Sequence, residues 1–125
     1  MPYDAPNDND MTMPAAADLS SSQYRIMAID ANGRATVAID PQAVSIIGIL
    51  QNKPDAADAA ARIRTSGISK LQFGAAANEG AYVTTNPQGF GTATTTANDQ
   101  VIGRVLHAPG GSADIQDVLV QYGRY

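Results

Sequence analysis

Residues 30–36 read Asp-Ala-Asn-Gly-Arg-Ala-Thr. Asn-Gly is the strongest short signal for a β-hairpin, because both residues tolerate a positive φ. Residues 86–92 read Asn-Pro-Gln-Gly-Phe-Gly-Thr, again a turn closed by glycine and followed by a short polar strand. Gly33 and Gly89 therefore occupy the same point of one local pattern, at an offset of 56 in the numbering.

Two further glycine pairs keep this spacing. A strand with a central glycine follows each turn, and a later strand ends in glycine. These pairs are Gly48 with Gly103, at an offset of 55, and Gly67 with Gly123, at an offset of 56. The near-constant offset predicts that one β unit occurs twice, over about residues 30–67 and 86–123.

The strands expected between these turns are short and regularly spaced, which is typical of an all-β barrel or sandwich. We therefore expect a small β-barrel or β-sandwich built from two related β units, and the sequence leaves both architectures open. The alanine-rich residues 55–61 have high helix propensity but no larger apolar stripe to bury. We interpret them as a loop or single turn before a strand at 61–65, with a short helix as the alternative.

The length of 125 residues corresponds to one domain. We expect an extended or flexible N-terminal arm at 1–22 and a single β domain at 23–125. The arm is polar, lacks Lys and Arg, and shows neither a strand nor a helix period. It is either disordered or ordered by a partner, and in the second case its apolar side chains are the partner-binding anchors. These candidate anchors are Tyr3, Met11, Met13 and Leu19.

Composition narrows the classes of function. The chain has no cysteine, which excludes disulfides and thiolate metal sites. No apolar run is long enough for a membrane span. The first residues combine no basic segment with an apolar one, so we expect no secretory signal. Four acids lie in residues 1–22, and the remainder balances eight acids with eight bases, so we expect neither a nucleic-acid nor a membrane partner. The apolar fraction is 44% but rich in Ala, and such a thin core gains stability from association.

Residues with catalytic chemistry are sparse. His107 is the single histidine, and the paired acids Asp55/Asp58 and Asp114/Asp117 lie in loops without a ligand-dense calcium pattern. We expect no enzyme activity, no metal site and no cofactor. Arg62 and Arg64 share one face of a strand. They either pair with acidic groups of a binding partner or form a solvated edge.

A family resemblance covers about residues 23–122. Residues 47–54 read Ile-Gly-Ile-Leu-Gln-Asn-Lys-Pro and precede an Ala-rich loop and a strand that ends in Gly67. This resembles the "G-L-Q-N-K-P" stretch of tailed-phage capsid cement (head decoration) proteins. Residues 80–89 resemble the family's "G-D-x-V-T-x-D-x-x-G", and residues 101–106 resemble its closing strand. Ala81 departs from the pattern, because an acidic residue is common there, and the N-terminal stretch is longer than the domain needs.

The resemblance implies a structural protein that binds the outside of an assembled capsid and stabilises contacts between capsomers. It implies the major capsid protein and copies of the same chain as partners, with homotrimers at threefold or quasi-threefold positions. The location implied is the outer capsid surface of the virion, after synthesis in the cytoplasm of a bacterial host.

A second hypothesis is a β module that binds carbohydrate or a host surface. Its site would combine the Thr-rich strand at 92–96 with exposed aromatic side chains, and a cluster of these on one face would favour it. The aromatic candidates are Tyr82, Phe90, Tyr122 and Tyr125.

Overall fold

The protein is described by a computed structural model that covers residues 9–125. Every element among these residues is a strand, so the all-β prediction is confirmed. Residues 55–59 form a turn, as the sequence indicated. The strands are β1 (Asn9–Pro14), β2 (Ile26–Ile29), β3 (Ala35–Val37), β4 (Ile46–Leu50), β5 (Ala60–Gln72), β6 (Tyr82–Thr85), β7 (Gly91–Ala93), β8 (Gln100–Val105) and β9 (Ile115–Arg124).

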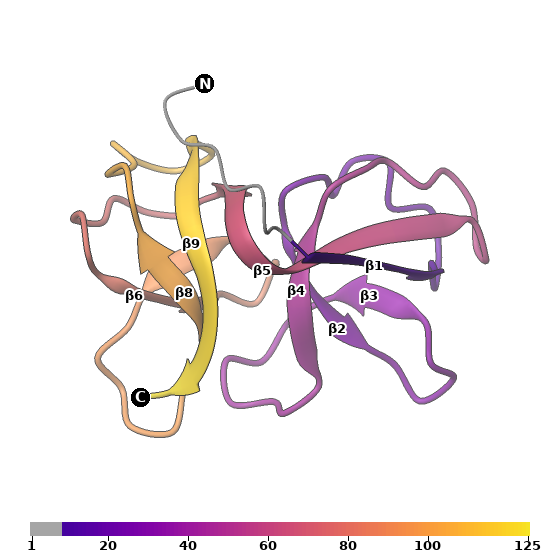
Figure 1. Cartoon of the computed structure of the whole chain (residues 1–125), viewed down its shortest axis with the longest axis horizontal. Helices are drawn as coiled ribbons and strands as arrows, with labels where there is room; N and C mark the ends of the chain where they lie inside the picture. Colours follow the sequence, from indigo (N-terminus) through magenta and orange to yellow (C-terminus); the bar gives the residue numbers. More distant parts are fainter. Residues whose placement is uncertain (1–8) are drawn as a thin grey trace.

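The strands form one antiparallel sheet in the order β3-β2-β4-β5-β9-β8-β6-β7, with β1 added to β5. This sheet curls into two lobes that lie side by side (Figure 1). An isolated parallel bridge closes each lobe, between Ala15 and Ala35 in one and between Phe73 and Gly91 in the other. The architecture is therefore two small barrels, which we call the first barrel (residues 9–66) and the second barrel (residues 67–125).

The two barrels share β5. Residues 60–66 of this strand pair with β1 and β4, whereas residues 67–72 pair with β9. The change of partner falls at Gly67, whose φ of +100° lies in a region that other residues rarely adopt. Figure 1 shows β5 bending between the lobes at the centre of the molecule. One strand thus ends the first barrel and begins the second.

The barrels have matching hydrogen bonds. Ala15 N donates to Ala59 O at 2.9 Å, and Phe73 N donates to Asp114 O at 2.8 Å. Ala38 N donates to Ile26 O at 2.9 Å, and the equivalent donor, Thr94 N, reaches Tyr82 O at the same distance. In this correspondence β1 is the counterpart of residues 67–72 of β5. Each unit therefore begins with a strand that the glycine spacing alone does not reveal.

The expected arm at 1–22 is placed differently by the structure. Residues 1–8 lie outside the described part of the chain, but residues 9–22 belong to the first barrel. β1 pairs with β5 along its whole length, and Met13 and Leu19 are buried in the barrel core. The strand period was missed because only one side chain of β1, that of Met13, is buried. The folded unit therefore starts near Asn9, not at residue 23.

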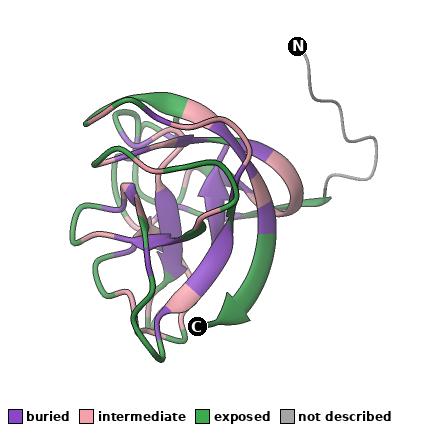
Figure 2. Ribbon diagram, turned by 90° about the vertical axis from the view of Figure 1, so that its left-hand side faces the viewer, coloured by how far each residue is buried: buried purple, intermediate pink, exposed green. Residues whose placement is uncertain are grey.

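A cluster of apolar side chains fills each barrel. Figure 2 shows the buried segments of the strands in purple. Equivalent positions recur, so that Leu50 and Ile63 in the first barrel match Val105 and Val118 in the second. The second cluster also includes Ile26, Ile46 and Ile49, which project from the outer face of the first barrel. This apolar contact holds the two barrels together, because each fully buried Ile side chain contributes roughly 1.5–3 kcal/mol.

Gly48 and Gly103 lie where two backbones approach closely. A Cβ atom on Gly48 would collide with the carbonyl oxygen of Arg64, and one on Gly103 would collide with that of Leu119. Both pairs are related by the repeat, so the same packing constraint fixes glycine in both units.

We expect Gly103→Ala to destabilise the protein by about 1–3 kcal/mol, because the new methyl group must displace backbone in a packed barrel. The free energy of unfolding, measured in urea, tests this expectation. Gly111→Ala is the matched control, since a Cβ there meets no atom within 4 Å. Equal unfolding free energies for the two variants would contradict the argument.

Candidate functional site

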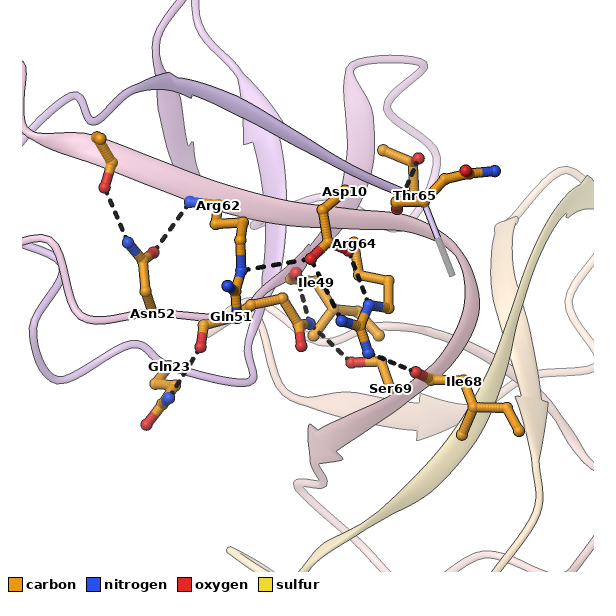
Figure 3. A network of polar contacts seen from close by, with 12 residues as sticks. Asp10, Gln23, Ile49, Gln51, Asn52, Arg62, Arg64, Thr65, Ile68 and Ser69 are labelled. Carbon is orange, nitrogen blue, oxygen red and sulfur yellow. Dashed lines mark hydrogen bonds and ion pairs between the residues drawn. The ribbon is translucent and has the colours of Figure 1, made fainter. Parts of the chain in front are cut away.

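The two arginines that the sequence singled out form a clamp with Asp10, which we call the arginine clamp (Figure 3). Arg64 donates to both carboxylate oxygens of Asp10, from Nε at 2.8 Å and from Nη2 at 3.2 Å. The Nε atom of Arg62 lies 3.3 Å from the same carboxylate. Arg64 Nη1 also donates to Ile68 O at 2.7 Å, across the bend at Gly67. The clamp fastens β1 to β5 where β5 changes barrel.

A buried amide continues this network between the barrels (Figure 3). Gln51 is 8% exposed and donates from Nε2 to Ser69 Oγ at 2.8 Å and to Ile49 O at 3.0 Å. Asn52 accepts a hydrogen bond from Arg62 N and donates to Ala60 O, both at 2.9 Å. Gln51 and Asn52 belong to the stretch that carries the family resemblance. Gln51 thus gives that stretch a structural role at the junction of the barrels, whereas Asn52 fastens it to β5 within the first barrel.

The other predicted partner-binding residues are dispersed. Met13 and Leu19 are 7% and 5% exposed inside the first barrel, so their side chains are occupied by the chain's own core. Met11 is 41% exposed, and Tyr3 lies outside the described residues. The Arg62 side chain is 53% exposed and that of Arg64 is 19% exposed. Asp10 of the same chain is thus the acidic group that both arginines contact, and about half of the Arg62 side chain stays exposed.

The second barrel carries a hollow of about 580 Å³. It is bounded by the outer face of β6 and β8 and by the last residues of β9, which Figure 2 shows as exposed near the C-terminus. We call it the tyrosine–arginine hollow. Its lining residues are Tyr82, Val101, Arg104, Gln121, Tyr122, Gly123, Arg124 and Tyr125.

Aromatic and cationic groups contact one another in this hollow. The rings of Tyr82 and Tyr125 meet edge to face, with their centroids 5.8 Å apart. The Arg104 guanidinium lies 5.0 Å from the centroid of the Tyr82 ring, which is a cation–π arrangement. Arg124 donates from Nη1 to Asn98 O at 3.0 Å. The hollow therefore presents two cations and no carboxylate among its lining side chains.

Tyr122 links the hollow to the first barrel. Its hydroxyl donates to the carbonyl oxygen of Ile47 in β4, although the residue as a whole is 44% exposed. Burial of that hydroxyl raises the pKa of Tyr122 well above the ordinary tyrosine value. The Tyr122 hydroxyl therefore stays protonated as the donor to Ile47 O, and the charged side chains of the hollow are those of Arg104 and Arg124, which suit an anionic or aromatic partner.

Three of the four aromatic residues of the carbohydrate hypothesis line this hollow. Phe90 does not, because it lies under the guanidinium of Arg25, 4.4 Å from its ring centroid. Sequence reasoning missed Arg104 and Arg124. The repeat held the signal for Arg104, because this residue aligns with Ile49 at the same offset that relates Gly103 to Gly48. An arginine at the position of a buried isoleucine indicates that this face is buried in the first barrel and exposed in the second.

The remaining titratable residues show simpler arrangements. His107 Nδ1 lies 3.3 Å from an Asp117 carboxylate oxygen, and neither residue lines the hollow. Among residues 9–125, no group of three or more His, Cys, Asp or Glu side chains is placed to hold a metal ion. No helix in this described part of the chain has the length and apolar character needed to cross a membrane.

Comparison with known proteins identifies a structural neighbour. No protein-family model and no curated protein sequence matches the chain. The fold is similar to that of the head fiber gp8.5 N base of bacteriophage phi29, with a TM-score of 0.72. The two share 13% sequence identity over 94% of this chain and 98% of the other. Likeness at this identity shows a common fold that includes both barrels.

The arginine clamp gives a prediction about stability. Asp10→Asn removes the charge shared by Arg62 and Arg64, and we expect the free energy of unfolding to fall by about 1–2 kcal/mol. Hydrogen exchange of the β1 amides should accelerate at the same time. Asp58→Asn is the control, because its side chain is 72% exposed and contacts Arg34 only at 3.5 Å. Unchanged β1 exchange in Asp10→Asn would contradict the role given to the clamp.

Proposed function

We propose that this chain is a structural protein of a tailed-phage head, which binds the outer surface of the assembled capsid. One observation carries the proposal: the two-barrel fold matches the base of a phage head fiber over nearly the whole of both chains. The resemblance of residues 47–54 to capsid cement proteins supports the same role. Within that stretch, Gln51 donates a hydrogen bond to Ser69 across the junction between the barrels.

The finer proposal is a capsid cement function. The chain binds the major capsid protein and other copies of itself, as a homotrimer, and stabilises contacts between capsomers. A ligand that binds only the assembled lattice shifts the equilibrium toward that lattice by mass action. Many copies that each contribute modestly then give a large total. The role needs no enzymatic activity and no cofactor, and it places the protein on the outer surface of the virion.

Binding to heads tests the proposal. Purified chain is mixed with empty heads assembled from the major capsid protein of the genome that encodes it, and the mixture is separated on a glycerol gradient. We expect saturable co-sedimentation with the heads and a higher temperature of head disassembly. Unassembled capsid protein and heads of an unrelated phage are the controls. Heads that sediment without the chain would rule the function out.

A second candidate function is favoured by the gathering of Tyr82, Tyr122 and Tyr125 around one hollow. Aromatic faces beside guanidinium groups suit a saccharide that carries carboxylates, and the hollow has the volume of a small ligand site. Calorimetric titration with a hexuronate oligosaccharide tests this candidate. Saturable binding that Tyr82→Ala abolishes would support it, and absence of heat from the unmodified chain would exclude it. Phe90→Ala is the control, because Phe90 lies outside the hollow.

A further inference from the structure

One face of the first barrel is covered by the second barrel. Ile26 and Ile49 on this face are 0% exposed, and Ile46 is 7% exposed. All three belong to the apolar cluster of the second barrel. The chain also passes along this face, because residues 66–70 of β5 lead directly into the second barrel.

The repeat places the tyrosine–arginine hollow on the equivalent face of the second barrel. Tyr82 aligns with Ile26 at an offset of 56, and Val101 and Arg104 align with Ile46 and Ile49 at 55. Gly123, which also lines the hollow, aligns with Gly67 at an offset of 56. Three residues that line the hollow, Tyr82, Val101 and Arg104, therefore have their counterparts in the covered face of the first barrel. The hollow is the second copy of a docking face, and within the described chain no third barrel covers it.

A turn of the second barrel reaches the covered face. Gly89, in the β6–β7 turn, accepts a hydrogen bond from Ile26 N at 2.8 Å. A Cβ on Gly89 would collide with the side chain of Val37 and approach Ile26 O at 3.2 Å. The next residue, Phe90, packs under the guanidinium of Arg25. This turn fits tightly against the first barrel.

The first barrel has an equivalent turn, between β2 and β3, that does not pack against another barrel in this chain. Asp30 Oδ1 accepts hydrogen bonds from the backbone N atoms of residues 32 and 34, both at 2.9 Å. Asn86 Oδ1 accepts the equivalent bonds from residues 88 and 90 at 2.9 and 3.0 Å. A Cβ on Gly33, the counterpart of Gly89, would meet no atom within 4 Å. The β2–β3 turn has the shape of the docked turn but is exposed.

We propose that the hollow of one chain binds the β2–β3 turn of a second copy of this chain. In this contact the β2–β3 turn takes the position against the hollow that the β6–β7 turn takes against the first barrel within a chain. It is heterologous, because the hollow of one copy meets the turn of the next, and such contacts form rings when their rotation closes. The inference rests on the proposed function in one respect, since it assigns the surfaces of the homotrimer proposed there.

The charges of the two surfaces are complementary. The side chains of Arg104 and Arg124 are cationic, and no Asp or Glu side chain lines the hollow. At the turn, Arg34 lies between Asp30 and Asp58, so this corner carries one net negative charge. Tyr and Arg are also the residues enriched at protein–protein interfaces. Tyr82 and Arg104 stand where the covered face has Ile26 and Ile49. Their polar groups make this surface compatible with water when the chain is free.

Sedimentation equilibrium over a range of concentrations tests the inference on the full chain. We expect the unmodified chain to self-associate, and we expect Arg104→Glu and Asp58→Lys each to weaken association about tenfold or more. The two changes combined in one chain should restore part of the lost affinity. Lys70→Glu changes the net charge as Arg104→Glu does, but it lies outside both surfaces, and we expect it to associate normally. Thermal unfolding followed by circular dichroism verifies that each variant is folded.

Three results would overturn the inference: a chain that stays monomeric up to millimolar concentration, self-association that Arg104→Glu leaves unchanged, or a monomer whose hollow binds the hexuronate oligosaccharide. Head binding by the same variants separates this inference from the proposed function. If the chain binds heads while Arg104→Glu self-associates normally, the inference fails and the function stands. If self-association responds as expected and no variant binds heads, the function fails and the inference stands.

Discussion

The shared strand β5 is the constraint on which the rest of the structure depends. Its residues 60–66 close the first barrel and its residues 67–72 open the second, so neither barrel is complete without it. Gly67 supplies the positive φ at the change of partner, and the arginine clamp holds β1, β5 and the bend together from one side. Because the barrels share a strand, their relative placement is fixed by backbone pairing as well as by side-chain packing. A rigid pair of barrels follows from this arrangement.

The two copies of the unit have diverged most on one face. In the first barrel that face is apolar and buried by its neighbour, whereas in the second it carries Tyr82 and Arg104 and is exposed. The interiors diverged less, because Leu50 and Ile63 are matched by Val105 and Val118, which are also apolar and buried. Divergence limited to an exposed face is expected when that face has acquired a binding role. The proposed self-docking and the saccharide candidate both place this role at the same hollow, and they differ in the occupant.

Much of this architecture could be predicted from the glycine spacing. Gly48 and Gly103 are fixed by close backbone approach, so their offset reports the repeat directly. β1 could not be predicted in the same way, because it buries only one of its side chains and the strand period is lost. Arg62 and Arg64 were recognised as a pair on one face, but their contact with Asp10 depends on the register of β1 against β5, which residue types do not encode. The hollow could not be predicted from the sequence, because it is formed by residues of β6, β8 and β9 that only the fold brings together.

The central proposal is that the two barrels joined by β5 form a building block of a phage head surface. A cryo-electron microscopy reconstruction of heads incubated with the chain tests this claim most directly. The account predicts ordered density for both barrels on the outside of the shell, with the β2–β3 turn of one copy in the hollow of its neighbour. A shell without added density, or with the chain only inside it, would contradict the account.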